Sequence, residues 1–315
     1  MNNKRIAIFG GGWIHNMGNA FLQLGAMAAI RRAKPDSIAY FLNGNNIDMP
    51  VRFRTTVFKK LGLNVFGDDL SRVHTNRLNV ADYASPDYVV LSGSWLCDKY
   101  IKDFGDALRT FQKNGSKLIF CGVSGFDYDK NEINVARKLL TELKPYALIS
   151  RDSTTFLNYA DLFEKSYEGI DVGFFIDDYY RIMPPMKSGY NVYCFDKIAI
   201  PSELKVNDKT VIAHHSLEGV RQDSFRYPRT LWSELPDDYL AVYSHALEMH
   251  SDRVHACLPV LIFGGKAQMY CDTPRANLFK EVGCEGINKH LVSLNEKITK
   301  EKKEKQAIFL SELLK

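Results

Sequence analysis

Residues 5–33 have the sequence RIAIFGGGWIHNMGNAFLQLGAMAAIRRA. The short apolar run Arg5–Phe9 has the length of a buried strand, and three glycines follow it directly. From Asn19 to Ala33, apolar residues recur at spacings of three and four, which is typical of an amphipathic helix. A strand that passes through a glycine turn into a helix is the usual opening of a βαβ unit. This stretch therefore predicts a Rossmann-like domain with a mostly parallel sheet.

The same alternation of short apolar runs and helical patterns continues through the first half of the chain. Further strands are predicted at Ser37–Leu42, Tyr88–Leu91, Lys117–Cys121 and Ala147–Ile149. Further helices are predicted at Phe53–Leu61, Asp103–Asn114 and Asn131–Leu143. Strands that alternate with helices of this length favour one parallel sheet covered by helices.

A second alternation follows a junction near Glu164–Asp171. Strands are predicted near Val172–Phe175, Tyr190–Phe195, Val211–His214 and Ala267–Cys271, and helices at Asp237–His250 and His255–Phe263. The sequence thus predicts an N-terminal Rossmann-like domain over residues 1–165 and a C-terminal one over 166–294. Residues 295–315 are predicted to form a helix that docks on a domain by its apolar end.

Composition and charge agree with two domains of this kind. The chain has 315 residues, of which 45% are hydrophobic and 25% charged, the proportions of an ordinary globular protein. Lys and Arg number 41 against 37 Asp and Glu, a net charge of +4. So small an excess makes a nucleic-acid coat improbable, although it can favour anionic substrates where it is concentrated.

The sequence also predicts a cytoplasmic protein. Its first residues are polar and basic, and no apolar segment has the length of a signal peptide or of a membrane span, so we expect at most peripheral membrane association. The six cysteines lack the paired spacing of a zinc site or a disulfide framework. Because no group of carboxylates suggests a metal either, none is predicted.

Three loops of small residues follow predicted parallel strands. The first runs from the glycine turn through Asn16, Gly18 and Asn19, the second contains Gly93 and Ser94, and the third contains Ser124. Glycine turns at a strand-to-helix junction let backbone amides approach an anion, and open α/β sheets bind ligands at this edge. The alternative is that these loops are only tight turns and that Asn19 only caps a helix.

Cationic residues follow several other predicted elements. Arg151 comes directly after Ala147–Ile149, where it can bind a carboxylate or phosphate or form an ordinary salt bridge between the domains. His214 opens a loop with Arg221, Arg226 and Arg229, and Lys266 and Arg275 follow later elements. Aromatic residues are interleaved with that loop. However, its basic surface is too small for a binder of single strands, and no nucleic-acid partner is predicted.

The segment SDRVHA, Ser251–Ala256, precedes the predicted helix His255–Phe263. Arg253 and His255 are two residues apart, so both can point toward one ligand. A guanidinium group clamps an oxyanion, and an imidazole moves a proton near neutral pH. The alternative is that His255 is a structural histidine.

These motifs, in this order, resemble those of the polysaccharide pyruvyl transferase family. The matching pieces span residues 5–275 and are Asn16–Asn19, Asp87–Ser94, Gly122–Gly125, Ser150–Ser153 and Ser251–Ala256 continuing into Lys266. Two positions depart from the pattern: many relatives have an aspartate at Asn19 and a third glycine where Ser92-Gly93-Ser94 stands. The resemblance implies two Rossmann-like domains facing a cleft, similar to the glycosyltransferase-B architecture.

The resemblance also implies an activity. Family members move the pyruvyl group of phosphoenolpyruvate onto two hydroxyls of a sugar as a cyclic ketal and release phosphate. For this chain it implies no cofactor beyond phosphoenolpyruvate as donor, and a sugar or a nucleotide-linked or lipid-linked glycan as acceptor. The family's arginine and histidine correspond to Arg253 and His255, our predicted catalytic residues. The predicted substrate-binding residues are Asn16, Gly18, Asn19, Gly93, Ser94, Ser124, Arg151, His214, Lys266 and Arg275.

Two other functions are compatible with the same residues. A glycosyltransferase or a nucleotide-sugar enzyme on this fold could use the glycine loops and the cations to bind a diphosphate, because fold does not decide function. A noncatalytic protein could bind a sugar or an anion in the same cleft without turning it over.

Overall fold

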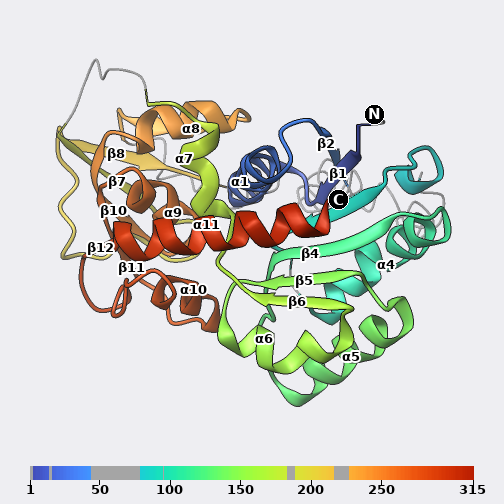
Figure 1. Ribbon diagram of the computed structural model, residues 1–315. Coiled ribbons are helices and arrows are strands. Elements are labelled where there is room, and N and C mark those ends of the chain that lie inside the picture. Colours follow the sequence, from blue (N-terminus) through green and yellow to red (C-terminus); the bar gives the residue numbers. More distant parts are fainter. Residues whose placement is uncertain (1–2, 14–15, 44–78, 95, 183–188, 216–226) are drawn as a thin grey trace, which may run out of the picture.

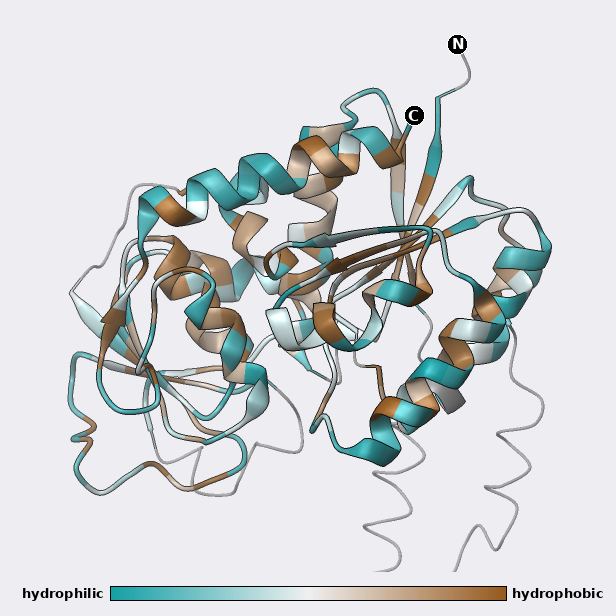
Figure 2. Cartoon of the chain, turned by 60° about the horizontal axis from the view of Figure 1, so that its bottom comes forward, coloured by the Kyte–Doolittle hydropathy of each residue, from teal (hydrophilic) through white to brown (hydrophobic). Residues whose placement is uncertain are grey.

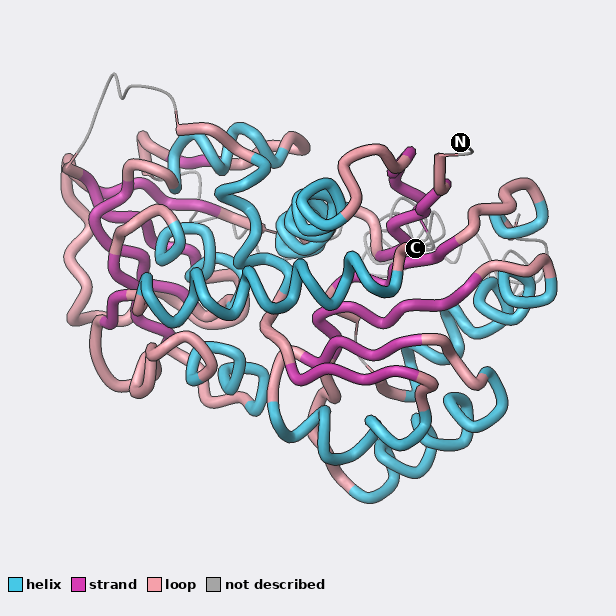
Figure 3. Tube along the Cα trace, viewed as in Figure 1, coloured by secondary structure: helices cyan, strands magenta, loops and turns pink. Residues whose placement is uncertain are grey.

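The computed structural model describes residues 3–13, 16–43, 79–94, 96–182, 189–215 and 227–315. Within these ranges the chain forms two α/β domains, each built on a six-stranded sheet. Figure 3 shows the strands as two separate groups with helices around and between them. The predicted helix Phe53–Leu61 lies outside the described residues, as do Arg221 and Arg226.

The first domain contains the first parallel sheet. Its elements are β1 (Arg5–Gly10), α1 (Met17–Ala33), β2 (Ile38–Asn43), η3 (Val80–Asp82), β3 (Tyr88–Ser92), α4 (Asp98–Lys113), β4 (Lys117–Val123), α5 (Lys130–Leu143), β5 (Ala147–Ser150), α6 (Ser153–Tyr159), η4 (Ala160–Leu162) and β6 (Lys165–Glu168). The strand order is β2-β1-β3-β4-β5-β6, and all neighbouring strands are parallel. The five strands predicted here from the sequence are confirmed within one or two residues.

The second domain follows an interdomain segment. This segment contains η5 (Val172–Phe175) and α7 (Ile176–Tyr179). The domain itself contains β7 (Tyr190–Cys194), β8 (Thr210–Ala213), β9 (Thr230–Leu231), α8 (Pro236–Tyr243), β10 (Ala246–Ser251), α9 (Val254–Ile262), β11 (Lys266–Met269), η7 (Pro274–Ala276), α10 (Asn277–Lys280) and β12 (Val292–Ser293). The strand order is β12-β11-β10-β7-β8-β9, parallel except for β12.

Two predicted elements are wrong. Val172–Phe175 is a 3₁₀ turn rather than a strand, and the predicted helix Asp237–His250 is α8 followed by β10. Val172–Phe175 is a short, fully buried apolar run without a periodicity that separates helix from strand. Between α8 and β10 only Ser244 and His245 intervene, and no glycine or proline marks the break. The predicted boundary between residues 165 and 166 falls inside β6, which pairs with β5, so the first sheet extends to Glu168.

Each sheet has a point at which the strand order reverses. In the first sheet it lies between β1 and β3, and in the second between β10 and β7. Loops that leave two such strands go to opposite faces of the sheet and leave a crevice at the carboxyl ends, where open α/β sheets bind ligands. The loops at these two points are therefore the first places to look for a site.

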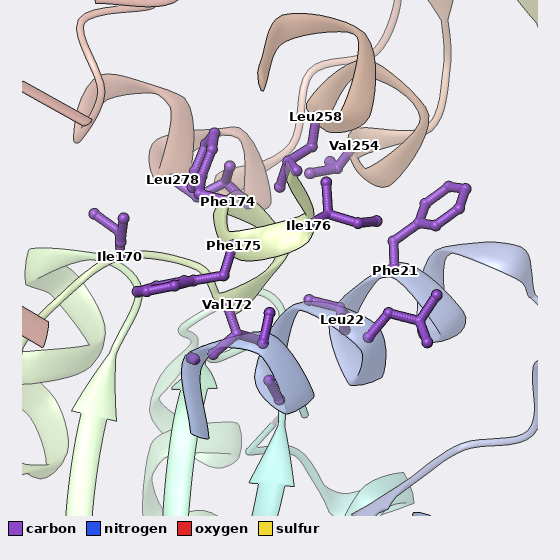
Figure 4. Packing of buried hydrophobic residues seen from close by; sticks show 14 of the residues in the cluster. Phe21, Leu22, Ile170, Val172, Phe174, Phe175, Ile176, Val254, Leu258 and Leu278 are labelled. Atoms are coloured by element: carbon purple, nitrogen blue, oxygen red, sulfur yellow. The ribbon is translucent and has the colours of Figure 1, made fainter. Parts of the chain in front are cut away.

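Helix α1 and the interdomain segment join the two domains through one buried core. Along α1, almost every residue from Met17 to Ile30 is buried. Figure 4 shows Phe21 and Leu22 of α1 beside Val172 and Ile176 of the interdomain segment, with Val254 and Leu258 of α9 packed above them, and Figure 1 shows α1 between the two sheets. The domains therefore share apolar surface rather than meeting only at polar edges.

The C-terminal helix α11 (Glu296–Leu313) crosses both domains, as Figure 1 shows. Its exposed side is largely hydrophilic, whereas its last turns are more apolar (Figure 2). Leu310 and Leu313 are buried, and the hydroxyl of Tyr88 on β3 donates to the carbonyl oxygen of Lys315. The predicted docking of this helix by its apolar end thus has a direct structural counterpart. No helix in the described ranges is long and apolar enough to cross a membrane.

Gly25 gives a test of the packing between α1 and the interdomain segment. A Cβ at this position would overlap the carbonyl oxygen of Val172 and would lie 3.0 Å from Cα of Gly173. Because both neighbours are main chain, neither can rotate away. We expect Gly25→Ala to lower the free energy of unfolding by about 3 kcal/mol, the upper end of the usual cost of overpacking. The measurement is urea denaturation. Asn134→Ala, on the exposed side of α5, is the control and should change stability by less than about 0.5 kcal/mol.

Candidate functional site

A cavity of about 210 Å³ lies between the domains at the reversal point of the first sheet. Its lining comes from the loops after β1 and β3, from α1 and α4, and from two residues of the second domain. The lining residues are Gly11, Asn16, Asn19, Leu22, Gln23, Ser92, Gly93, Ser94, Cys97, Tyr100, Asp103, Phe104, His255 and Arg275. The crevice expected from the strand order is therefore present, and the second domain closes it.

The first turn of α1 holds the glycine turn in place. Asn16 caps the helix by accepting from the Gly18 amide at 3.1 Å. Asn19 donates to the carbonyl oxygen of Gly12, and Gln23 donates to that of Gly11 at 2.6 Å. A Cβ at Gly10 would lie 2.9 Å from Nε2 of Gln23, so the glycine permits this close contact. Asn16 and Asn19 thus shape the cavity wall from within one helical turn.

His255, in the first turn of α9, lies against a buried carboxylate. Its Nε2 is 3.5 Å from Oδ2 of Asp171, and the same oxygen accepts from Nη1 of Arg151 at 3.1 Å. The other oxygen, Oδ1, accepts from the Gly173 amide. The opposite side of the imidazole faces α1, since a Cβ at Gly18 would lie 3.3 Å from Nδ1. Gly18 therefore gives the room in which His255 reaches the cavity.

Burial and charge set the protonation of this pair in opposite directions. Burial alone would raise the pKa of the Asp171 carboxyl, but His255, Arg151 and the Gly173 amide outweigh it, and the pKa lies below its ordinary value. Burial lowers the pKa of His255, and Arg151 and Arg275 lower it further against the opposing effect of Asp171. At neutral pH the pair is thus a carboxylate beside a neutral imidazole, the state required of a general base.

Positive charge accumulates behind the cavity. Burial lowers the pKa of Arg275, which lines the cavity, to about 9, and repulsion from Arg151 and Arg253 contributes in the same direction. Guanidinium groups remain charged in proteins, so Arg275 is a buried cation near two others. A bound phosphate or carboxylate would relieve that repulsion and would take bidentate hydrogen bonds.

Arg253 and His214 meet at a second buried carboxylate, at the reversal point of the second sheet. Asp196 follows β7; its Oδ2 accepts from Nε of Arg253 at 3.0 Å, and its Oδ1 lies 3.1 Å from Nδ1 of His214. Asp252 accepts the amides of Asp196, Lys197 and Ile198, and this holds the loop after β7. The Arg253 side chain is 21% exposed, whereas His214 is buried.

The residues predicted from the sequence fall into three groups, according to where they lie relative to the cavity. Residues that line the cavity are Asn16, Asn19, Gly93, Ser94, His255 and Arg275, and Gly18 touches His255 from the α1 side. Four predicted residues do not line the cavity: Ser124, Arg151 and His214, which are buried, and Arg253, which is partly exposed. Lys266 is exposed at the amino end of β11, paired in register with Glu248 near the start of β10.

Two of these placements correct the prediction. Lys266 begins β11 and therefore lies at the amino ends of the strands, opposite His255, which follows the carboxyl end of β10, so it does not join this site. Arg151 has no exposed side-chain surface and binds Asp171, so it does not itself face the cleft. Its guanidinium forms part of the support of His255.

Sequence reasoning missed Asp171 and Asp196. Asp196 could have been found, because a polar residue directly after a parallel strand marks the ligand edge of the sheet. Asp171 gave no such signal, since it follows no predicted strand and its partners lie far away in the chain. Within the described ranges, no group of three or more His, Cys, Asp or Glu side chains is arranged to hold a metal ion.

Comparison with known proteins bears on the fold. No protein-family model and no curated protein sequence match the chain. Similar solved structures include S. aureus MnaA in complex with UDP (TM-score 0.54, 13% identity, 99% of this chain and 91% of that one). They also include UDP-N-acetylglucosamine 2-epimerase from Rickettsia bellii (TM-score 0.54, 11% identity, 99% and 95%) and a putative one from Listeria monocytogenes (0.52, 12%, 99% and 91%).

These likenesses extend over nearly the whole chain and show its fold. The protein has two Rossmann-like domains facing a cleft. The fold class predicted from the sequence, similar to the glycosyltransferase-B architecture, is confirmed.

Asp171→Asn tests the buried carboxylate. The amide keeps an acceptor for the Gly173 amide but leaves the Arg151 guanidinium buried without a countercharge. We expect a loss of about 3–5 kcal/mol in the free energy of unfolding, measured by chemical denaturation. Asp161→Asn is the matched control, because Asp161 pairs with Arg137 on the surface, where such a pair contributes less than about 1 kcal/mol. Equal losses in the two variants would contradict this account.

His215 gives a prediction for acid. Its Nε2 lies 2.8 Å from the Tyr243 hydroxyl, and burial lowers its pKa from 6.5 to about 3. Below pH 6.5 the unfolded chain therefore binds a proton at His215 that the folded protein does not bind until about pH 3, so stability falls as the pH falls through this window. We expect the urea midpoint to drop between these pH values and the drop to be smaller in His215→Gln. The exposed His290→Gln should not change it.

Proposed function

We propose that this protein is an enzyme of sugar metabolism that binds a phosphorylated donor in the interdomain cavity and uses His255 to move a proton. One observation carries the proposal: the imidazole of His255, backed by Asp171, reaches the same cavity as the guanidinium of Arg275. A base and an anion clamp in one small cavity allow proton transfer to a group that a phosphate or carboxylate holds in place.

The geometry gives each of these residues a distinct task. Asp171 orients the imidazole of His255 and stabilises the imidazolium that forms when His255 takes a proton, the task that a carboxylate has in other acid–base pairs. Arg275 binds the anionic part of the donor and stabilises negative charge that develops on a leaving phosphate. Asn16, Asn19 and Ser94 supply further polar groups in the cavity lining.

A nucleotide sugar is the donor class that we place first. The support comes from the fold, since similar structures include UDP-N-acetylglucosamine 2-epimerases and a complex with UDP. On this proposal the diphosphate lies toward Arg275 and the sugar toward His255. A glycosyltransferase and a nucleotide-sugar epimerase would share this binding mode and differ in the product that they release.

Pyruvyl transfer from phosphoenolpyruvate is the second candidate. The resemblance of Ser251–Ala256 supports it, as does the volume of the cavity, about 210 Å³, which suits a small acid better than a whole nucleotide sugar. In this reaction the methylene carbon of the donor is protonated, and one sugar hydroxyl adds to the neighbouring carbon and loses its proton. A second hydroxyl then forms the other C–O bond of the ketal, also with loss of its proton, as phosphate leaves. His255 would carry one of these protons, and Arg275 would hold the donor's anionic groups.

The experiment that separates the candidates measures binding and product together. UDP, UDP-N-acetylglucosamine and phosphoenolpyruvate are each screened by thermal shift, and reactions with sugar acceptors are followed by mass spectrometry. Release of a nucleotide diphosphate or a changed nucleotide sugar supports the first candidate, and phosphate release with a ketal supports the second. Binding without any product would show a noncatalytic ligand-binding protein and would overturn the proposal.

His255→Gln tests the catalytic assignment. It removes the proton-transfer group but keeps a polar side chain of similar size. We expect turnover of whichever donor is active to fall by about 10²–10⁴-fold, the usual contribution of a positioned acid or base, while the ligand-induced thermal shift is retained. Arg275→Gln should instead abolish the thermal shift. Unchanged turnover in His255→Gln would refute the role given to His255.

A further inference from the structure

The segment that carries Asp171 is held from three sides. The Gly169 amide donates to the carbonyl oxygen of Ser150, which continues the pairing of β6 with β5. The Ile170 amide donates at 2.8 Å to Oε1 of Gln306, a residue of α11 that lies 136 positions further along the chain. Asp171 itself accepts from the Gly173 amide. Between the last strand of the first domain and η5, the main chain therefore depends on one side chain of the C-terminal helix.

Gln306 is placed for this contact and for no other polar contact in the described structure. The residue has no exposed surface, and its Nε2 has no hydrogen-bond partner among the described residues. A Cβ at Gly169 would overlap Oε1 of Gln306 and would lie 2.7 Å from Cγ2 of Ile149, so the glycine lets the side chain lie flat on the main chain. Burial of a glutamine with half its amide unpaired is costly, which argues that its oxygen serves a specific purpose.

Contacts on both sides of Gln306 fix α11 over the interdomain segment. Toward the amino end of the helix, Lys303 is buried and pairs with Asp177 and Asp178 of α7. Toward its carboxyl end, Phe309 stacks on Tyr167 of β6 with ring centroids 5.1 Å apart. The oxygen of Gln306 is thus held at a defined position relative to both ends of the interdomain segment.

We propose that Gln306 is a positioning residue of the candidate active site, because it fixes the main chain at Ile170 and thereby the Asp171 carboxylate that faces His255. The helix α11, remote in sequence from every motif, then belongs to the support of the site. As far as turnover is concerned, this inference rests on the function proposed above. The position of Asp171 can be tested without any substrate.

The test uses the full-length protein without ligand. The His255 imidazole is titrated by NMR, with its signals assigned through the His255→Gln variant. The charged groups that face His255 are Asp171, Arg151 and Arg275, and of these Asp171 alone raises the pKa of the imidazole. Asp171→Asn therefore gives a reference in which the midpoint of His255 moves down. We expect Gln306→Met, which removes the acceptor at similar size, to move it in the same direction.

Two further variants separate positioning from general stability. Gln306→Glu keeps an acceptor oxygen at the same reach and should not show the downward shift. Phe309→Ala removes one flanking contact of α11 but keeps the hydrogen bond from the Ile170 amide to Gln306, so it should lower Tm and shift the midpoint less than Gln306→Met does. If Gln306→Met does not fold, Gln306→Leu removes the acceptor without leaving room for a water molecule and serves in its place. An unchanged midpoint in Gln306→Met or Gln306→Leu, or an equal shift in Phe309→Ala, overturns the proposal.

Turnover gives the second readout once a donor is established. We expect Gln306→Met to lower kcat on the order of tenfold, the effect usual for residues that orient a catalytic group, with little change in KM. A shift of the His255 midpoint without any enzymatic product would leave the positioning intact and refute the proposed function alone. If the wild type turns over a donor but the titration midpoint of His255 is the same in Gln306→Met as in the wild type, the positioning role is refuted and the proposed function is not.

Discussion

The carboxylate of Asp171 connects the two domains and the chemistry of the cavity. It has no exposed surface, and it binds Arg151 of the first domain while it faces His255 of the second. Transfer of a carboxylate from water into a protein interior costs several kcal/mol, so the arrangement persists only while the Arg151 guanidinium and the His255 imidazole both stay in place. The relative position of the domains and the protonation of His255 therefore depend on the same contact.

Close packing around this contact comes from glycines in one helix. Gly25 lets the middle of α1 approach the main chain at Val172, and Gly18 lets its first turn approach His255. Since α1 also ties down the glycine turn through Asn19 and Gln23, one helix both builds the interdomain core and shapes the cavity wall. Changes in the interface should consequently reach the site.

The sequence predicted the first domain well because its signals are local. The strand Arg5–Phe9, the glycine turn and the helix after it follow from the spacing of apolar residues over a few turns, and β1 and α1 agree with them. The predicted helix Asp237–His250 failed because α8 passes into β10 through Ser244 and His245 alone, without a glycine or proline that would mark the break in the sequence. Lys266 was misplaced because it follows a helix and begins β11, which puts it at the amino ends of the strands, whereas open α/β sheets bind ligands at the carboxyl ends.

The sequence by itself thus determined the alternation of strands and helices, the two Rossmann-like domains, and the small-residue loops that line the cavity. These features depend on the spacing of apolar residues and on the positions of small residues within short stretches of the chain. Only the tertiary structure decided that Arg151 binds Asp171 instead of a ligand. It also decided that Asp196 contacts both Arg253 and His214, and that Gln306 accepts a hydrogen bond from the Ile170 amide. These roles arise when groups far apart in the chain are buried together and each buried polar atom must find its partner.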